Sequence, residues 1–316
     1  MTSHTPSRLV GLIGSGIGGS LSPALHEAEA RAQGIGYAYR VLDIDTLGVR
    51  PEDAPEVLES ARRLGFDGLN VTHPCKQTVL PALDALSPQA AAIGAVNTVV
   101  LDGGRAVGHN TDTTGFAAGL TRALPDARLD RVVLLGAGGA GAAVGHAALS
   151  LGAGRLTVVD VAQDRAEALA DRLRAHFGTE RVLTAPRTDL DARLAAADGL
   201  LHATPTGMVG HPGCPLDPAA LHPGLWVADV VYRPLETALL RHAQRAGCPV
   251  VGGGGMAVFQ AVHAFELFTG ATPDAERMLR HFARLTANGN PEEQAGGRAP
   301  HATDPHHTTG AATTAA

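Results

Sequence analysis

The chain has 316 residues, of which 45% are hydrophobic, and this is enough to build two packed domains. Its net charge of −6 gives no basic surface, so we expect neither nucleic acid nor an anionic membrane as a partner. The three cysteines are widely spaced and no apolar run reaches about 18 residues, which argues against a disulfide framework, a Cys-x-x-Cys metal site and a membrane span. We expect a cytoplasmic protein without a bound metal.

The first segment joins an apolar run to a glycine-rich loop. Residues 8–13 predict a buried strand, and Gly14–Gly19 follow with a Gly-x-Gly-x-x-Gly pattern. No helix begins within these glycines, so we interpret them as a flexible loop and not as a dinucleotide loop. The loop presents the hydroxyls of Ser20 and Ser22. Ser22 also has the character of an N-cap for a helix that Pro23 opens.

Strands and helices then alternate, which predicts a mostly parallel sheet. The strand that ends at Asn70 is followed by Thr72 and Lys76, whose hydroxyl and ammonium can reach a polar ligand. Residues 95–101 predict a further strand, which a Gly-Gly hairpin turn continues into 106–109. The next residues, Asn110 to Asp112, carry more polar groups than one helix cap requires, although Asp112 alone fits an N-cap or a first-turn acid.

A complete βαβ unit follows at residues 131–160. Its first strand leads directly into Gly136-Ala137-Gly138-Gly139-Ala140-Gly141, and the helix at 140–151 grows from these glycines. This context predicts a dinucleotide site with the pyrophosphate at the helix N-terminus. Asp160 ends the second strand, where a carboxylate accepts from a ribose hydroxyl and favours NAD. Arg165 leaves NADP open, because a guanidinium there can hold the 2′-phosphate or stack on adenine.

The remaining segments complete the second sheet and return to the first domain. A strand at 199–203 ends in small polar residues that face the cofactor crevice of a doubly wound sheet. Four glycines at 252–255 precede a helix with Gln260 off its apolar stripe. An amphipathic helix at 273–285 is expected to pack back on the first domain. The tail at 288–316 has no apolar periodicity and is predicted to be disordered.

Together these motifs resemble the shikimate/quinate dehydrogenase family over residues 8–285. Asn70-Val71-Thr72-His73-Pro74-Cys75-Lys76 matches its Asn-Val-Thr-x-Pro-x-Lys motif, and Ser20-Leu21-Ser22-Pro23 matches its Ser-x-Ser-Pro loop. The resemblance implies that Lys76 and Asp112 are the catalytic pair. The implied substrate-binding residues are Ser20, Ser22, Thr72, Lys76, Asn97, Asp112 and Gln260. The implied cofactor-binding residues are Gly136, Gly138, Gly139, Ala140, Gly141, Asp160, Arg165, Ala203, Thr204, Thr206, Val230 and Gly253.

The predicted fold class is α/β with two domains. Residues 8–112 form a mostly parallel substrate-binding domain, completed by C-terminal helices at about 265–286, and residues 113–264 form a Rossmann-type NAD(P)-binding domain. The implied activity is reversible hydride transfer between shikimate and 3-dehydroshikimate in a monomer or homodimer. Alternatives are a dehydrogenase of an aminated shikimate analogue and a non-catalytic ligand sensor, against which the Lys76–Asp112 pair argues.

Two departures from the family pattern bear on the ligands. Asp160-Val161-Ala162 replaces the Asn-Arg-Thr-like run of the common NADP-using members, so we expect NAD to be preferred over NADP. In this respect the chain looks most like the NAD-using quinate/shikimate branch. Ser22 stands where quinate-handling members tend to have Thr, so the resemblance implies shikimate as a substrate and leaves quinate open.

Overall fold

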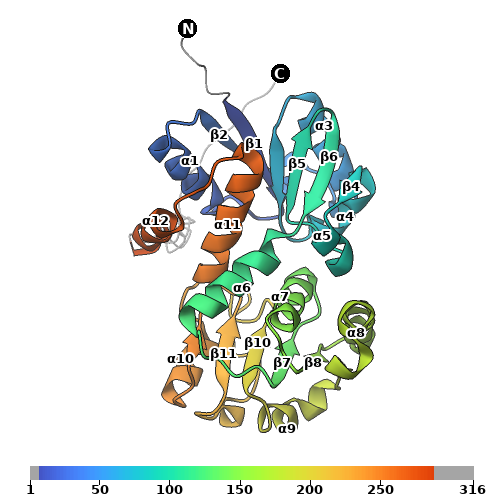
Figure 1. Cartoon of the computed structure of the whole chain (residues 1–316), viewed down its shortest axis with the longest axis vertical. Helices are drawn as coiled ribbons and strands as arrows, with labels where there is room; N and C mark the ends of the chain where they lie inside the picture. Colours follow the sequence, from blue (N-terminus) through green and yellow to red (C-terminus); the bar gives the residue numbers. More distant parts are fainter. Residues whose placement is uncertain (1–6, 288–316) are drawn as a thin grey trace, which may run out of the picture.

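The computed structural model describes residues 7–287, so the predicted disordered tail lies outside the described part. Two α/β units lie one above the other and are joined by the long helices α6 (Thr111–Ala123) and α11 (Gly254–Thr269) (Figure 1). These helices pack closely, because a Cβ on Gly115 of α6 would lie 2.5 Å from the backbone nitrogen of Gln260 in α11. Within residues 7–287, no helix is long and apolar enough to cross a membrane.

The first sheet has the strand order β2-β1-β3-β5-β6-β4. Its strands are β1 (Arg8–Gly14), β2 (Tyr37–Asp43), β3 (Gly68–Val71), β4 (Ala85–Leu86), β5 (Thr98–Asp102) and β6 (Arg105–His109). Only β5 runs against its neighbours, so the prediction of a mostly parallel sheet is confirmed. The reason is the predicted hairpin, in which Gly103 and Gly104 have positive φ angles of 54° and 78°.

The helices of the first unit largely follow the predicted pattern. They are α1 (Ser22–Ala32), α2 (Ile44–Leu47), α3 (Ala54–Arg63), α4 (Cys75–Thr78) and α5 (Pro88–Ile93), with 3₁₀ turns at Pro51–Asp53 and Leu80–Ala82. One detail of the prediction is wrong, because Leu21 is the N-cap of α1 and no side chain caps it. Ser22 is the first helical residue, and its side chain bonds to Tyr39 in the neighbouring strand instead.

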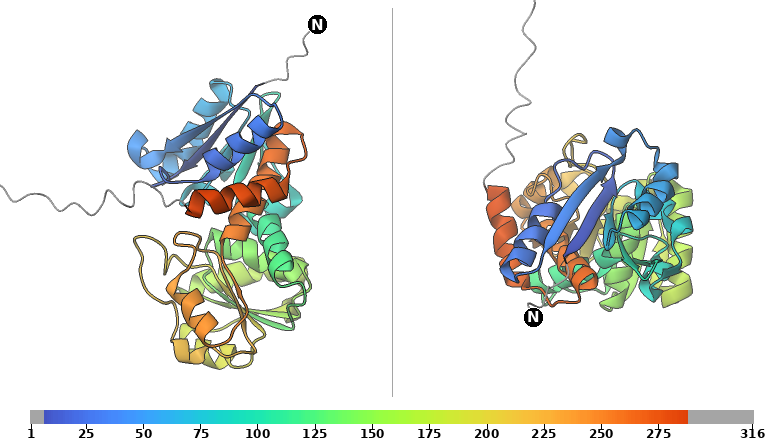
Figure 2. Two further views of the ribbon diagram at one scale, coloured as in Figure 1. Left: turned by 90° about the vertical axis from the view of Figure 1, so that its left-hand side faces the viewer. Right: turned by 90° about the horizontal axis from the view of Figure 1, so that it is seen from above.

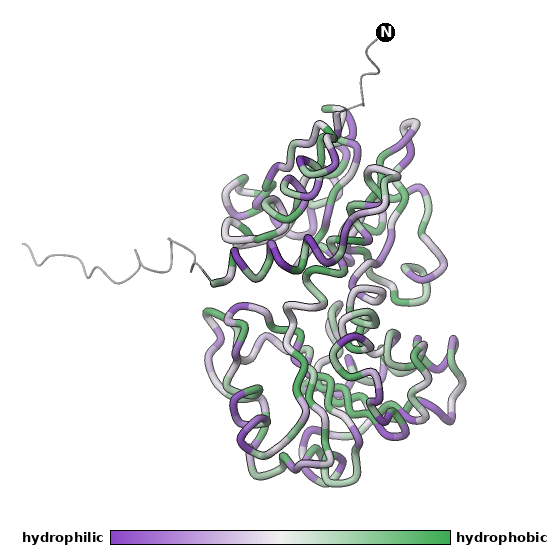
Figure 3. The backbone as a smooth tube through the Cα atoms, turned by 60° about the vertical axis from the view of Figure 1, so that its left-hand side comes forward, coloured by the Kyte–Doolittle hydropathy of each residue, from purple (hydrophilic) through white to green (hydrophobic). Residues whose placement is uncertain are grey.

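The second sheet is parallel throughout, in the order β12-β11-β10-β7-β8-β9. Its strands are β7 (Arg131–Leu135), β8 (Arg155–Val159), β9 (Val182–Thr184), β10 (Gly199–His202), β11 (Trp226–Asp229) and β12 (Val250–Val251). This is the Rossmann order, and the winding reverses between β7 and β10, where such sheets bind dinucleotides. Figure 3 shows these strands as largely hydrophobic, as expected for a sheet covered on both faces.

Helices cover both faces of this second sheet. They are α7 (Gly139–Ser150), α8 (Gln163–Phe177), α9 (Leu190–Leu194) and α10 (Ala238–Arg245), with 3₁₀ turns at Thr179–Arg181, Arg187–Asp189 and Pro218–Ala220. The last helix, α12 (Ala275–Ala287), leaves this unit and lies against α1 (Figure 2). The prediction that the final helix packs back on the first domain is therefore confirmed.

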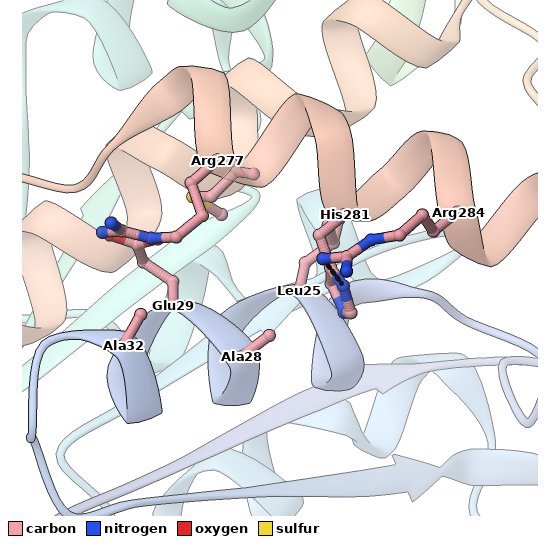
Figure 4. A pocket seen from close by; sticks show the side chains of 8 residues that line it. Leu25, Ala28, Glu29, Ala32, Arg277, His281 and Arg284 are labelled. Atoms are coloured by element: carbon pink, nitrogen blue, oxygen red, sulfur yellow. Dashed lines mark hydrogen bonds and ion pairs between the residues drawn. The ribbon is translucent and has the colours of Figure 1, made fainter.

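The contact between α12 and α1 is built around Glu29, whose side chain is fully buried (Figure 4). Arg277 donates to both carboxylate oxygens, at 2.6 and 2.7 Å, and Gln33 and the backbone nitrogen of Asp274 add hydrogen bonds. Burial alone would raise the pKa of Glu29, but these hydrogen bonds outweigh it and hold the pKa below its usual range. The carboxylate therefore anchors α12 in its ionised form.

Replacing Arg277 is expected to loosen this anchor. In Arg277→Met the free energy of unfolding should fall by about 2 kcal/mol, because the Glu29 carboxylate stays buried without its cation. The loss should be smaller than for a fully buried ion pair, because the Arg277 side chain is partly exposed. Denaturant titration measures this difference. Arg122→Met is the matched control. It removes an exposed ion pair with Glu276, which lies on α12 like Arg277, and should lower the free energy of unfolding by less than about 1 kcal/mol.

The same prediction has a defined pH dependence. Because the folded pKa of Glu29 is lowered, its stabilising effect is present above the unfolded value of about 4.3 and is lost as the pH falls through the folded pKa. The stability difference between wild type and Arg277→Met should therefore shrink in acid. A difference that persists unchanged at low pH would contradict this account.

Candidate active site

Lys76 and Asp112 form an ion pair between the two units. Lys76 lies in α4, directly after β3, and its Nζ donates to Oδ2 of Asp112 in the first turn of α6. The side chains are 17% and 9% exposed, so the pair is largely withdrawn from water. Lys76 is the only lysine among the 25 lysines and arginines of the sequence. The site therefore has a side-chain ammonium, whereas the other 24 of these residues carry guanidinium groups.

Asn97 holds Asp112 from the other side. Its Nδ2 donates to Oδ1 of Asp112 at 2.8 Å and lies 2.9 Å from Oγ1 of Thr111, while its Oδ1 accepts from the Thr111 backbone nitrogen at 2.6 Å. Asn97 is 3% exposed. Its amide is thus engaged within the protein in this structure, and the expected contact with a substrate hydroxyl stays a prediction.

A buried chain of polar groups connects this pair to the substrate loop. The Tyr39 hydroxyl donates to Oδ1 of Asn70 at 2.8 Å, and Asn70 Nδ2 donates to Thr98 Oγ1 at 3.1 Å. Burial raises the pKa of Tyr39, which its hydrogen bond with Ser22 partly offsets. Thr98 in turn donates to Asn97. The sequence did not reveal Tyr39 or Thr98, because each stands in an apolar strand and reads as a core residue.

The other predicted substrate residues surround this chain. Ser20 and Ser22 are partly exposed, and Ser20 Oγ accepts from the Ser22 backbone nitrogen at 3.3 Å. The loop before them is held by Asp43, which accepts from two of its backbone nitrogens. Thr72 extends the sheet at β1 through its backbone, and the Gln260 side chain donates to Ala257 of its own helix. Substrate contacts of these side chains stay predictions.

The second unit supplies two further side chains near the substrate loop and Asp112, both following β11. Arg233 donates to the backbone oxygen of Gly19 and so connects the second unit to the substrate loop. Burial raises the pKa of Tyr232, and the Asp112 carboxylate raises it further, while Arg233 lowers it. Neither residue was predicted. The available signal was their position just after a parallel strand, whereas the family resemblance implied only their neighbour Val230.

The glycine-rich turn after β7 lies beside Lys76. Gly136 has a φ angle of 108°, a left-handed conformation that favours glycine. Helix α7 begins at Gly139 without a side-chain cap, so its first backbone N–H groups are open to an anionic ligand. A Cβ on Gly139 would lie 3.5 Å from Cδ of Lys76, and one on Gly138 would lie 3.5 Å from the Arg165 guanidinium. Ala140 and Gly141 continue this helix into the core.

Asp160 lies where the sequence predicted a ribose-binding acid, but it is 7% exposed. One carboxylate oxygen accepts from the backbone nitrogen of Ala137 at 2.7 Å, and the other accepts from that of Ala162 at 2.9 Å. The carboxylate thus fixes the backbone of the glycine-rich turn at Ala137. Each oxygen keeps a second lone pair, so a ribose hydroxyl remains a feasible partner and the contact stays a prediction.

Four of the implied cofactor-binding residues follow the carboxyl ends of β10 and β11, on the side that the family resemblance assigns to the nicotinamide: Ala203, Thr204, Thr206 and Val230. A Cβ on Gly136 would lie 2.6 Å from the backbone oxygen of Ala203 and 3.0 Å from Cγ2 of Thr204. Thr206 donates its backbone N–H to Thr204 Oγ1 at 3.3 Å. On the neighbouring strand, a Cβ on Gly253 would lie against the backbone oxygen of Val230. The structure thus brings these segments together around the switch point.

This fold and site define a two-domain α/β protein with a Rossmann-type sheet. A family model described as the shikimate dehydrogenase substrate binding domain matches residues 12–99, and one described as the shikimate 5'-dehydrogenase C-terminal domain matches residues 253–281. An NADP(+) shikimate dehydrogenase of Streptomyces avermitilis is 65% identical over 88% of this chain and 96% of its own.

Two further relatives carry different names. An NAD(+) quinate/shikimate dehydrogenase of Corynebacterium efficiens is 50% identical over 88% of this chain and 99% of its own. The quinate dehydrogenase of Corynebacterium glutamicum, solved in complex with NAD, has a TM-score of 0.83 and 48% identity over 88% of this chain and 99% of its own. The chain therefore belongs to the shikimate/quinate dehydrogenase family.

Proposed function

We propose that this protein is an NAD(P)-dependent shikimate dehydrogenase that also has quinate as a candidate substrate. The observation that carries the proposal is the Lys76–Asp112 pair, which lies between a substrate loop with two serines and an open helix N-terminus. The names of the relatives support the same activity. Residues 8–112 would bind the ring acid and residues 113–264 the dinucleotide.

Each residue of the site has its own role in the proposed reaction. In the reductive direction the Lys76 ammonium donates a proton to the new alkoxide, and in the oxidative direction its amine accepts the hydroxyl proton. Asp112, held by Asn97, fixes the orientation of Lys76. The hydroxyls of Ser20 and Ser22 are placed to bind the substrate carboxylate. A bound nicotinamide dinucleotide would supply the hydride acceptor or donor.

The glycine-rich turn fits such a cofactor. The uncapped N-terminus of α7 offers backbone donors to a pyrophosphate, and small residues at Gly136, Gly138 and Gly139 allow its close approach. We infer that NAD is preferred over NADP, because the Asp160 carboxylate would repel a 2′-phosphate. The names of the relatives include both cofactors, and Arg165 beside Gly138 provides a cation for either one.

Changing Asp160 tests the cofactor preference. In Asp160→Asn one of the two backbone N–H groups that donate to this side chain loses its acceptor, so we expect kcat/KM with NAD to fall. Removal of the charge should nevertheless shift the ratio of kcat/KM for NAD over NADP towards NADP by about 10- to 100-fold. The control Asp171→Asn neutralises an exposed acid on α8 and should leave the ratio within about 2-fold. An unchanged ratio in Asp160→Asn would contradict the assignment.

A substrate panel tests the activity itself. NAD(P)H absorbance is followed with shikimate, with quinate and with an aminated shikimate analogue, using each cofactor. Turnover with shikimate supports the proposal, and turnover with the aminated analogue alone would assign the chain to that reaction instead. Binding without turnover of any of the three would identify a ligand sensor and contradict the proposal.

A further inference from the structure

A chain of buried polar side chains crosses the carboxyl ends of β10 and β11. His202, the last residue of β10, is fully buried, and its Nδ1 lies 2.9 Å from Oδ1 of Asp229, the last residue of β11. Its Nε2 lies 2.5 Å from Oγ1 of Thr204. The proposed reaction uses neither His202 nor Asp229. A histidine and a carboxylate withdrawn from water at a strand end therefore need another explanation.

The hydrogen bonds of Asp229 determine which nitrogen of the His202 ring carries the hydrogen. The Asp229 carboxylate also accepts from the backbone nitrogen of Val231 at 3.0 Å and from the hydroxyl of Thr237 at 2.7 Å. An ionised carboxylate only accepts, so Nδ1 of His202 carries the hydrogen towards it. In this tautomer, assigned from the network, Nε2 accepts from the Thr204 hydroxyl. Thr204 Oγ1 accepts in turn from the backbone nitrogen of Thr206.

This chain of bonds begins at β10, one of the two strands between which the winding of the sheet reverses. On one side, Thr204 lies against Gly136, since a Cβ on that glycine would approach Cγ2 of Thr204 to 3.0 Å. On the other side, Val231 lies against Gly253, with 2.8 Å between its backbone oxygen and a Cβ built there. His202 and Asp229 therefore connect the two segments that follow β10 and β11, next to the predicted nicotinamide site. The Thr204 hydroxyl itself is engaged by His202.

We propose that His202 is a positioning residue which, with Asp229, holds the Thr204–Thr206 loop and the residues after β11 in the arrangement that receives the nicotinamide end of the cofactor. The inference rests on the proposed dinucleotide binding. Supporting side chains of this kind act by fixing the geometry of the groups that touch the ligand. The role of Thr204 is then to set the shape of its loop, through a hydroxyl bonded to His202 and a methyl packed on Gly136.

The test compares ligands with and without a nicotinamide. His202→Leu removes both ring contacts, and Thr204→Val removes only the hydroxyl while keeping the shape of the side chain. NADH affinity is measured by fluorescence and ADP-ribose affinity by calorimetry, because ADP-ribose has the adenosine and pyrophosphate but no nicotinamide. Thr204→Val should lose about 10-fold in NADH affinity, as expected for one hydrogen bond, and His202→Leu at least as much; both should change ADP-ribose affinity by less than about 2-fold.

Turnover measurements and a control variant at another buried histidine complete the experiment. With shikimate, both variants should lower kcat more than they raise KM for shikimate. Together they should lose less than the sum of the single effects, because the two residues belong to one network. His146→Leu is the control: it also removes a buried histidine, on α7, whose Nδ1 partner is Ser150, and it should leave both affinities unchanged.

Two results would overturn the inference. One is wild-type affinity and turnover in both Thr204→Val and His202→Leu. The other is an equal loss of NADH and ADP-ribose affinity, which would indicate a general loss of domain structure. A wild-type chain that bound neither NADH nor NADPH would contradict the proposed function itself, and is thereby distinguished from a failure of the His202 assignment alone.

Discussion

Lys76→Arg is expected to abolish turnover while leaving shikimate binding largely intact. Arginine keeps the positive charge and the ion pair with Asp112, but its guanidinium does not release a proton in proteins. General acid–base catalysis contributes about 10²- to 10⁴-fold, so kcat should fall by roughly 10³-fold. Stopped-flow absorbance measures kcat, and calorimetry measures the shikimate Kd, which should change by less than about 5-fold.

The single lysine of the chain offers a second, independent measurement. Reductive methylation should modify one side chain besides the α-amino group, because the other 24 of the 25 lysines and arginines are arginines. Bound shikimate should protect Lys76 from the reagent, and Lys76→Arg should show no side-chain label. Retention of more than about a tenth of kcat in Lys76→Arg would show that another group transfers the proton.

The second large effect is expected for Asp112→Asn. Asp112 accepts from Lys76 at one oxygen and from Asn97 at the other, so both neighbours present hydrogens to it. An asparagine amide can face only one of them with its oxygen, and its NH₂ group must then face the other donor. The variant should displace Lys76 and lower kcat by about 10²-fold, with a smaller effect on KM for shikimate.

Asp198→Asn is the matched control for Asp112→Asn. Asp198 is equally buried, and it accepts from the Arg131 backbone at the amino end of the second sheet, whereas Lys76 lies beside the turn at its carboxyl end. Its substitution should alter thermal stability without changing kcat. A loss of kcat in Asp198→Asn as large as in Asp112→Asn would show that the effect comes from disturbed folding.

Local patterns alone determined most of the secondary structure. The strand predicted at 8–13 is β1 (Arg8–Gly14) and the helix predicted at 140–151 is α7 (Gly139–Ser150), because apolar periodicity, glycines and the ends of each element are encoded within a few positions. The prediction of Ser22 as an N-cap was wrong. The same hydroxyl can cap a helix or bond to a neighbouring strand, and only packing decides between these partners.

The sequence by itself also placed Lys76, Asp112 and the glycines of the Rossmann turn, since short motifs carry them. Only the tertiary structure revealed how these residues are held. Tyr39 and Asn70 are 31 positions apart, and Arg233 and Gly19 are 214 apart. His202 meets Asp229 only because β10 and β11 are neighbours in the sheet. Such contacts depend on how strands and helices pack, and no spacing within a single segment encodes them.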